Sequence, residues 1–230
     1  MILQRLREEV LEANLEIVRR GLVLYTFGNA SGFDPDSNRV VIKPSGVAYE
    51  TLKPEHFVVV DINGSTVDGD LRPSSDLPTH LALYRAFKGV RGVVHTHSRY
   101  ATAWAQARKD IPCLGTTHAD YLRGPIPVTA HMPTEEIESE YELNTGHAII
   151  RLFRNLDPFE TPAVLVAGHA PFTWGPTPAD AAHMAVIVEE LAHLAYLTFA
   201  INHEAGQLSD TLRDKHFLRK HGATAYYGQK

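Results

Sequence analysis

Two histidines separated by one residue carry the clearest chemical signal in the sequence. His95 and His97 follow the apolar run Gly92-Val93-Val94, which has the composition of a strand. Side chains in an extended strand alternate between its two faces, so both imidazoles are expected on the same side. Two neighbouring imidazoles at a strand end are half of a site for a divalent metal. A metal held there can act as a Lewis acid on a substrate oxygen.

A third histidine and an aspartate can complete such a site. His169 follows the apolar segment Val164-Leu165-Val166-Ala167, where a turn would expose it beside the end of a sheet. Three neutral imidazoles suit Zn²⁺, with Mn²⁺ and Co²⁺ as alternatives. Asp76, at the predicted start of a helix, has three open roles: a fourth ligand, an acid or base, or the cap of that helix. A chain with 13 histidines can also contain a His-x-His pair by chance.

The composition is that of a globular protein without a dividing linker. The chain has 230 residues, of which 44% are hydrophobic and 21% charged, so we predict a single domain over residues 1–230. A net charge of −5 disfavours nucleic acid or an anionic membrane as a partner. The single Cys113 excludes an intramolecular disulfide and fits a reducing cytoplasm. The N-terminus is too charged for a signal peptide, and the apolar stretch 191–201 is too short to cross a bilayer.

Hydrophobic periodicity predicts interleaved helices and strands. Helices are predicted from residue 3 to about 21, over 76–87 and 98–107, from 134, through 148–153, and over 178–203 and 209–221. Strands are predicted at 23–26, 39–42, 57–61, 92–97, 126–128 and 164–167, with a hairpin turn at Asn63-Gly64. Because these elements do not alternate strictly, we predict an α/β layered fold whose central sheet is mixed, largely antiparallel and flanked by helices.

Six short motifs together resemble those of a known family. They are Gly28-Asn29-Ala30-Ser31, Lys43-Pro44-Ser45-Gly46, Pro73-Ser74-Ser75-Asp76, His95-Thr96-His97-Ser98, Thr116-Thr117-His118-Ala119-Asp120, and a C-terminal segment with Arg219-Lys220-His221-Gly222 and Ala225-Tyr226-Tyr227-Gly228-Gln229. Their order and spacing over essentially the whole chain resemble the class II aldolase/epimerase family, and within it the L-ribulose-5-phosphate 4-epimerases. An aspartate at position 76 favours that branch, because fuculose-phosphate aldolases of the family carry a glutamate there.

The resemblance implies a metal site and a phosphate pocket. The metal ligands would be His95, His97 and His169, with Asp76 also at the metal. The phosphate pocket would consist of Gly28, Asn29, Lys43, Ser45, Gly46, Ser74 and Ser75. These residue types suit an anion: glycines allow close approach of backbone N–H groups, a helix N-terminus favours negative charge, and lysine adds a positive one. On its own, the Lys43-Pro44-Ser45-Gly46 motif would indicate only a turn.

The implied reaction needs two acid/base groups. The C4 hydrogen of a ketopentose phosphate is not acidic, because the carbonyl is at C2, so C4 is better inverted by breaking and re-forming the C3–C4 bond. The resemblance assigns the two groups to Asp120 and Tyr227, with His216 holding Asp120, and places Thr116 and Glu142 around the site. It also implies a homotetramer with active sites at subunit boundaries, in which the C-terminal segment acts on a neighbour's metal.

The sequence leaves several alternatives open. The predicted reaction converts L-ribulose 5-phosphate to D-xylulose 5-phosphate, and the first rival is a sugar-phosphate aldolase that releases its aldehyde. A second rival is a catalytically inert interaction module, as in actin-associated relatives of the fold, which the histidines and anion loops disfavour. A third is a structural protein with incidental histidines. The identity of the metal, the direction of reaction and the pathway (L-arabinose, L-ascorbate or L-xylulose breakdown) are not determined by the sequence.

Overall fold

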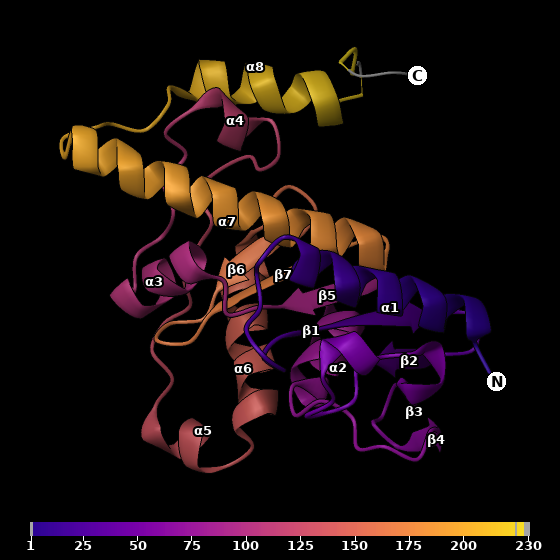
Figure 1. Cartoon of the computed structure of the whole chain (residues 1–230). Coiled ribbons are helices and arrows are strands. Elements are labelled where there is room, and N and C mark those ends of the chain that lie inside the picture. The colour runs from indigo at the N-terminus through magenta and orange to yellow at the C-terminus, as the bar shows by residue number, and fades with distance from the viewer. Residues whose placement is uncertain (1, 224, 228–230) are drawn as a thin grey trace.

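The molecule is built around one seven-stranded sheet, shown by a computed structural model that describes residues 2–223 and 225–227 (Figure 1). The strand order is β4-β3-β2-β1-β5-β7-β6, and every neighbouring pair of strands is antiparallel. The strands are β1 (Asn29–Asp34), β2 (Arg39–Ile42), β3 (Val58–Asp61), β4 (Thr66–Asp68), β5 (Gly92–His95), β6 (Ala163–Leu165) and β7 (Pro171–Gly175). The predicted α/β fold with a sheet flanked by helices is confirmed, and its strand pairing is antiparallel rather than mixed.

Helices cover both faces of this sheet. One face carries α1 (Gln4–Arg19) and α7 (Pro178–Ile201), and the other carries α2 (Leu77–Ala86) and α6 (Tyr141–Leu152), above and below the sheet in Figure 1. The remaining helices are α3 (Arg99–Ala107), α4 (Thr116–Ala119), α5 (Thr134–Glu138) and α8 (Asp210–His221), with 3₁₀ turns at Tyr49–Thr51, Pro54–His56 and Phe153–Asn155.

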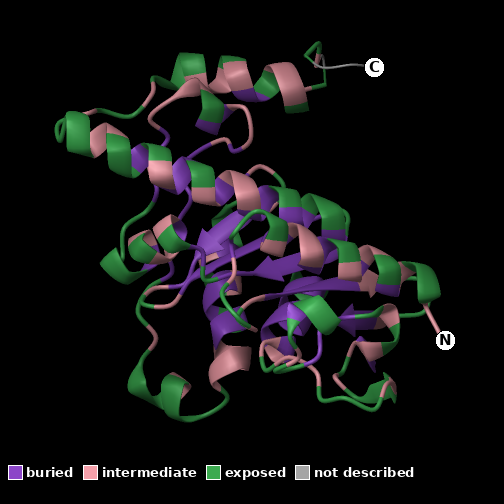
Figure 2. Cartoon of the chain, in the orientation of Figure 1, coloured by how far each residue is buried: buried purple, intermediate pink, exposed green. Residues whose placement is uncertain are grey.

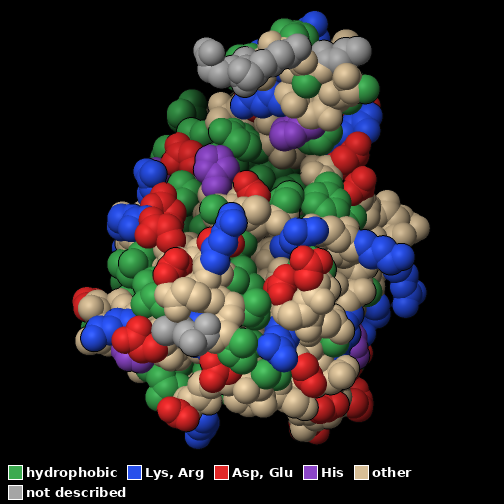
Figure 3. Space-filling model, turned by 90° about the vertical axis from the view of Figure 1, so that its right-hand side faces the viewer, with side chains coloured by type: hydrophobic (Ala, Val, Ile, Leu, Met, Phe, Trp, Pro, Cys, Tyr) green, Lys and Arg blue, Asp and Glu red, His purple; other side chains and the backbone are tan. Residues whose placement is uncertain are grey.

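Alternation along the strands gives each face its own core. Val40 and Val58 pack with α2, while their neighbours Val41 and Val59 pack with α1. Figure 2 shows the sheet buried between the two helical layers. A sheet covered on both faces requires apolar side chains at successive positions, which explains the unbroken valine runs of β2 and β3. On the face in Figure 3, acidic and basic side chains are interspersed.

The long helix α7 serves as a core helix along much of its length. By length and composition it could cross a membrane, with a mean hydropathy of 1.6 over its most apolar stretch. Its N-cap residue is Thr177, whose side chain accepts a hydrogen bond from the Asp180 amide at 3.1 Å. Residues from Ala181 to Ala195 pack against β5, β7, α1 and α3. Burial in this core accounts for part of its apolar character: 33% of its most apolar stretch is buried, and large apolar side chains near its C-terminal end are exposed.

The first strand differs from the prediction. Residues 23–26 form no strand but a turn in which Tyr25 has a φ of 52°, and the strand of this region is β1, further along the chain. Its sequence, Asn-Ala-Ser-Gly-Phe-Asp, is poor in β-branched residues and gave no strand signal. Close packing against α1 explains the small residues of β1. At Gly32, for example, a Cβ atom would lie 2.7 Å from the Leu6 side chain, too close a contact unless that side chain shifts.

Four further elements depart from the prediction. The predicted strand 126–128 forms only isolated bridges, from Ile126 to Ile111 and from Val128 to Leu165. The short helix α4 and the strand β7 were not predicted. Strand β7 was missed because it starts with a proline, a residue that strands tolerate only at their first position or at a sheet edge. Strand β5 ends at His95, so His97 lies in the loop after it.

Candidate metal centre and anion pocket

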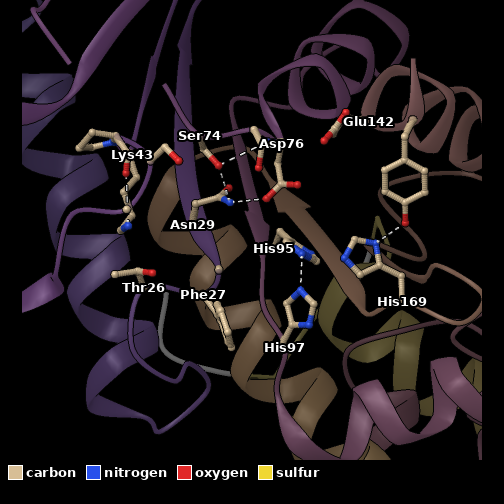
Figure 4. Close-up of a pocket in the computed structure, with 16 residues that line it drawn as sticks. Thr26, Phe27, Asn29, Lys43, Ser74, Asp76, His95, His97, Glu142 and His169 are labelled. Carbon is tan, nitrogen blue, oxygen red and sulfur yellow. Dashed lines mark hydrogen bonds between the residues drawn. The ribbon is translucent and has the colours of Figure 1, made fainter. Parts of the chain in front are cut away.

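One pocket at the ends of the central strands collects most of the predicted site residues. Its volume is about 390 Å³, and it lies where β5 ends and where β1, α2 and α6 begin (Figure 4). The predicted residues that line it are Gly28, Asn29, Lys43, Ser45, Gly46, Ser74, Ser75, Asp76, His95, His97, Glu142 and His169. Thr26, Phe27, Pro44 and Tyr141 line it as well and were not predicted.

Three imidazoles converge at one side of this pocket. The facing nitrogens of His95, His97 and His169 lie within 4.8 Å of one another. The Nε2 atoms of His95 and His97 are 3.1 Å apart, and both rings are about 5 Å from the ring of His169. A tetrahedral zinc ion with Zn–N bonds of about 2.0 Å needs its nitrogens roughly 3.3 Å apart. The triad therefore fits a divalent metal with only small movements of the side chains.

His95 is the most firmly held member of the triad. It is only 2% exposed, and its ring stacks on Phe172 of β7 at a centroid distance of 4.2 Å. Its Nδ1 lies 3.0 Å from the carbonyl oxygen of Pro171. Because that oxygen can only accept a hydrogen bond, Nδ1 carries the proton and Nε2 presents its lone pair to the pocket, the form a metal ligand needs.

His169 is presented by the tight turn between β6 and β7. Gly168 adopts a φ of 73°, in the left-handed region that favours glycine, and the amide of Val166 donates to the carbonyl of Ala170 at 3.0 Å. The Nδ1 of His169 lies 3.3 Å from the hydroxyl of Tyr141, which starts α6. Burial, together with the neighbouring imidazoles, lowers the pKa of His169 to about 4, so the ring is neutral and able to bind a metal at neutral pH.

His97 is positioned through the helix that follows it. Helix α3 begins two residues later, and the hydroxyl of its N-cap residue Ser98 makes no capping bond. The Glu189 carboxylate of α7 takes that place, accepting from the amides of Tyr100 and Ala101 at 2.8 and 2.9 Å. A carboxylate at a helix N-terminus accepts hydrogen bonds from free backbone amides and interacts favourably with the positive end of the helix dipole. Glu189 thus ties the segment after His97 to the core helix.

Asp76 occupies the N-cap position of α2 without capping it. Its side chain makes no bond to the helix amides and instead accepts a hydrogen bond from the Nδ2 of Asn29 at 2.6 Å. Burial raises the pKa of Asp76, but the nearby His95 and His80 and the Asn29 amide outweigh it and hold the pKa below its ordinary value. The capping role is excluded, and the carboxylate is an ionised group in the pocket, outside the group of three facing nitrogens.

Two loops joined by backbone hydrogen bonds form the opposite side of the pocket, left of the triad in Figure 4. The amide of Ser45 donates to the carbonyl oxygen of Arg72 at 2.9 Å, and the amide of Ser74 donates to the carbonyl oxygen of Lys43 at 3.0 Å. Ser75 and Gly46 are exposed at the mouth, just before the N-terminus of α2. Hydroxyls, a glycine turn and a helix N-terminus gathered in this way suit a phosphate group.

Lys43 lies deep beneath this cradle. Only 2% of the residue is exposed, and its Nζ sits 4.7 Å above the ring of Tyr49. The Nζ donates to the Pro44 carbonyl at 3.4 Å, and no carboxylate pairs with Lys43 among the described residues. Burial lowers the pKa of Lys43 to about 8. A buried ammonium of this kind is ready to pair with an anion entering the pocket.

The predicted acid/base residues lie elsewhere, between α4 and α8. Asp120 accepts hydrogen bonds from Nδ1 of His216 at 3.0 Å and from Arg219 at 2.8 Å, and the ring of Tyr227 covers Arg219 at 4.5 Å. Burial acts to raise the pKa of Asp120, but the bonds from Arg219 and His216 lower it below its ordinary value. Thr116 starts α4 in the same region.

This second group is separated from the triad within one chain. In Figure 1, α4 and α8 lie beyond α7, away from α2 and α6. Among the described residues, Asp120, His216, Tyr227 and Thr116 do not line the pocket. Gly228 and Gln229 of the C-terminal motif lie outside the described residues. A single chain therefore holds the metal-ligand set and the predicted acid/base pair in two different places.

Sequence reasoning missed three residues that hold the site. Tyr141 contacts His169 and immediately precedes the predicted Glu142, so its position in the first turn of α6 was an available signal. Glu189 accepts a hydrogen bond from Ala101, 88 positions earlier in the sequence, and no local sequence motif indicates this role. His80, four residues after Asp76 on α2, could have been found from helical spacing alone.

Changing Glu189 tests how the segment after His97 is held. Glu189→Gln removes the negative charge and one hydrogen-bond acceptor at the start of α3. We therefore expect the free energy of unfolding, measured in urea, to fall by about 1 kcal/mol. Amide exchange at Tyr100 and Ala101 should accelerate. Glu190→Gln, which alters an exposed carboxyl on the same helix, is the control. Unchanged exchange at both amides would show that the carboxylate does not hold α3.

Comparison with known proteins agrees with this architecture. Residues 8–196 match the family described as Class II Aldolase and Adducin N-terminal domain. An L-fuculose 1-phosphate aldolase structure is 26% identical with a TM-score of 0.78, covering 92% of this chain and 94% of that chain. YgbL from Klebsiella pneumoniae, a putative aldolase/epimerase/decarboxylase, is 26% identical with a TM-score of 0.71, covering 94% and 99%. The L-fuculose-1-phosphate aldolase of Thermus thermophilus is 25% identical with a TM-score of 0.68, covering 89% and 99%. This chain therefore belongs to the class II aldolase and adducin N-terminal domain family.

Proposed function

We propose that the protein is a metal-dependent enzyme that inverts C4 of L-ribulose 5-phosphate to give D-xylulose 5-phosphate. One observation carries the proposal: a single pocket combines an anion cradle at one side with three facing imidazoles at the other. Its volume of about 390 Å³ is in the range of small-molecule sites. A sugar phosphate can place its phosphate in the cradle and its oxygens near the triad.

The triad fits a resident divalent metal, most simply Zn²⁺. His95, His97 and His169 would hold it, with the ionised Asp76 beside them. When bound, the metal would stabilise negative charge that develops on the sugar oxygens. The protein's own contribution is to keep the imidazoles neutral and oriented, through burial, the Pro171 carbonyl and the Tyr141 hydroxyl.

The anion cradle would hold the cleaved aldehyde by its phosphate, so that either face of the aldehyde can react when the bond re-forms. Loss of the C4 hydroxyl proton and cleavage of the C3–C4 bond leave a two-carbon aldehyde that carries the phosphate. The electron pair of the broken bond stays on the three-carbon fragment as an enediolate. Lys43 and the serines around it would retain this phosphate. Held by one end, the aldehyde can turn its other face to the reaction before the bond re-forms. One group must accept the hydroxyl proton on one side, and another must return a proton on the other.

We infer that Asp120 and Tyr227 are these two groups and that they act in the pocket of a neighbouring copy. Asp120 is held in the ionised, proton-accepting form, with His216 as its hydrogen-bond partner. Arg219 contacts both Asp120 and Tyr227, so the pair is presented as one unit. Exposed apolar side chains at the nearby end of α7, among them Tyr196 and Ile201, support an interface with another copy.

An aldolase of the same family is the second candidate. Two of the three solved structures compared above carry the name L-fuculose 1-phosphate aldolase, and an aldolase needs only the cleavage half of the reaction. Asp76 and the Asp120–Tyr227 pair support the epimerase, because re-addition on the opposite face requires two separate acid/base groups. The products distinguish the two candidates.

The product assay tests the proposed reaction. Zinc-loaded protein is incubated with L-ribulose 5-phosphate, and D-xylulose 5-phosphate and free glycolaldehyde phosphate are followed together. We expect the epimer to form without release of aldehyde. Stoichiometric aldehyde with little epimer would replace the proposal with the aldolase. No turnover by protein that binds zinc would require a different sugar phosphate.

The low pKa of Lys43 predicts a pH-dependent affinity for the sugar phosphate. Phosphate binds the charged ammonium, and the pKa of the free protein's Lys43 is about 8. Binding therefore weakens as the pH rises above 8, by up to about tenfold per pH unit. Calorimetric titration of the metal-free protein with L-ribulose 5-phosphate between pH 7.5 and 9.5 measures this. Lys43→Gln should bind more weakly with a flat profile, and a wild-type profile equally flat would contradict the assignment.

Mixing two inactive variants tests the shared site. His95→Ala removes a metal ligand and Tyr227→Phe removes an acid, so neither variant alone should turn over substrate. Random reassembly of the two as equal partners restores about a quarter of the sites if each pocket takes Tyr227 from a neighbour. Sedimentation establishes that the subunits exchange. Exchange without recovered activity would show that each chain uses its own Tyr227.

A further inference from the structure

Polar side chains continue from the pocket into the core between α2 and β1. Asp76, His80 and Tyr84 recur at every fourth position, so they share one face of α2. Asn29 and Ser31 alternate on β1 and share the face that meets it. We call these five residues the polar ladder. It starts at the pocket with Asp76 and Asn29, whose positions Figure 4 shows, and ends in the core at Tyr84.

The ladder is joined by short hydrogen bonds. Asn29 Nδ2 donates to Asp76 Oδ2 at 2.6 Å, which forms its outer rung. The Ser31 Oγ lies 2.7 Å from His80 Nδ1 and 2.7 Å from the Tyr84 hydroxyl, which forms its inner rungs. Ser31 and His80 are fully buried, and Tyr84 is 5% exposed.

Packing stability alone does not account for the ladder. The rest of the contact between α2 and the sheet is apolar, including Leu77, Leu81 and Leu83. Burial of polar groups costs stability unless all their bonds are made. Within the described residues, His80 Nε2 and Asn29 Oδ1 are buried without a hydrogen-bond partner. An apolar row would avoid this cost, so the polar groups point to a role in the pocket.

The ladder reaches two sides of the metal centre. His80 lies one helical turn after Asp76, and its backbone amide donates to the Asp76 carbonyl oxygen at 3.1 Å. The His80 ring also meets the edge of Phe172 at 6.0 Å, and Phe172 stacks on His95. Movement of α2 by one residue along β1 would break all the rungs, because each depends on a matched pair of positions.

We propose that His80 is a positioning residue, which with Ser31 and Tyr84 fixes the register of α2 against β1 and so holds Asp76 at the metal centre. The inference rests on the metal site of the proposed function, and it assigns a task to side chains that touch neither metal nor substrate. It predicts that loss of an inner rung acts on the metal through Asp76. Loss of an unrelated buried hydrogen bond should have no such effect.

A double-mutant cycle on zinc affinity tests the proposal. Ser31→Ala removes both inner rungs and Tyr84→Phe removes one, each with little change of shape, and both variants are prepared with and without Asp76→Ala. Zinc affinity is measured by competition with a chromophoric chelator. We expect each single variant to bind zinc about tenfold more weakly. In the Asp76→Ala background the same changes should cause no further loss. The Co²⁺ absorption spectrum should change in the single variants as well.

A matched control separates positioning from general destabilisation. Thr173→Val also removes a buried hydroxyl, one that donates to Ala181 of α7 at 2.9 Å, and should lower stability while leaving zinc affinity unchanged. Equal losses in both Asp76 backgrounds, or no loss at all, would overturn the proposal. Urea unfolding identifies a variant that does not fold, in which case the other rung variant decides. Sugar turnover is not part of this readout, so failure of the proposed reaction remains a separate result.

Discussion

The antiparallel register at the centre of the sheet is the constraint on which the site depends. Asn29 of β1 lies opposite His95 of β5, and His95 lies opposite Phe172 of β7. A slip of one residue would turn His95 toward α7 and separate Asn29 from Asp76. The other end of β5 is fixed as well, because a Cβ on Gly92 would lie 2.2 Å from the carbonyl oxygen of Thr177. Only glycine allows the start of α7 to approach so closely, so the strand that presents His95 is held at both ends.

The site concentrates groups that oppose folding. Lys43 is buried without a carboxylate partner, three imidazoles crowd together, and Asp76 leaves its own helix uncapped. Each arrangement costs stability in the free protein, and binding of a cation at the triad and an anion in the cradle would return part of it. The apolar interior of the sheet supplies the compensating stability. This division explains why the three imidazoles and the anion cradle stand at the ends of elements while most side chains in the element interiors are apolar.

The sequence predicts the site better than it predicts the strands around it. The triad follows local signals, an apolar run before His95 and another before His169. The cradle was predicted only through the family resemblance, because the turn after Lys43 does not by itself indicate an anion site. Strand β1 was missed because contacts with α1 and α2 selected its small and polar residues, and strand propensity did not. The Ser74-Ser75-Asp76 motif has the composition of a helix cap, and only the distant Asn29 decides that its carboxylate faces the pocket. Glu189 and Ser31 were missed for the same reason, since their partners lie far along the chain.

The separation of the two functional groups bears on the size of the working unit. Arg219 contacts both Asp120 and Tyr227 and so links these two residues on the surface formed by α4 and α8. The imidazoles instead face a pocket on the side of the sheet covered by α2 and α6, with α7 between the two places. Bringing them together within one chain would require α8 to leave α4 and would break the Asp120–Arg219 pair. A second copy can supply the pair with both surfaces intact. If Asp120 and Tyr227 are the acid/base pair proposed above, the reaction requires a second copy of the chain, and every chain would then contribute half of two sites.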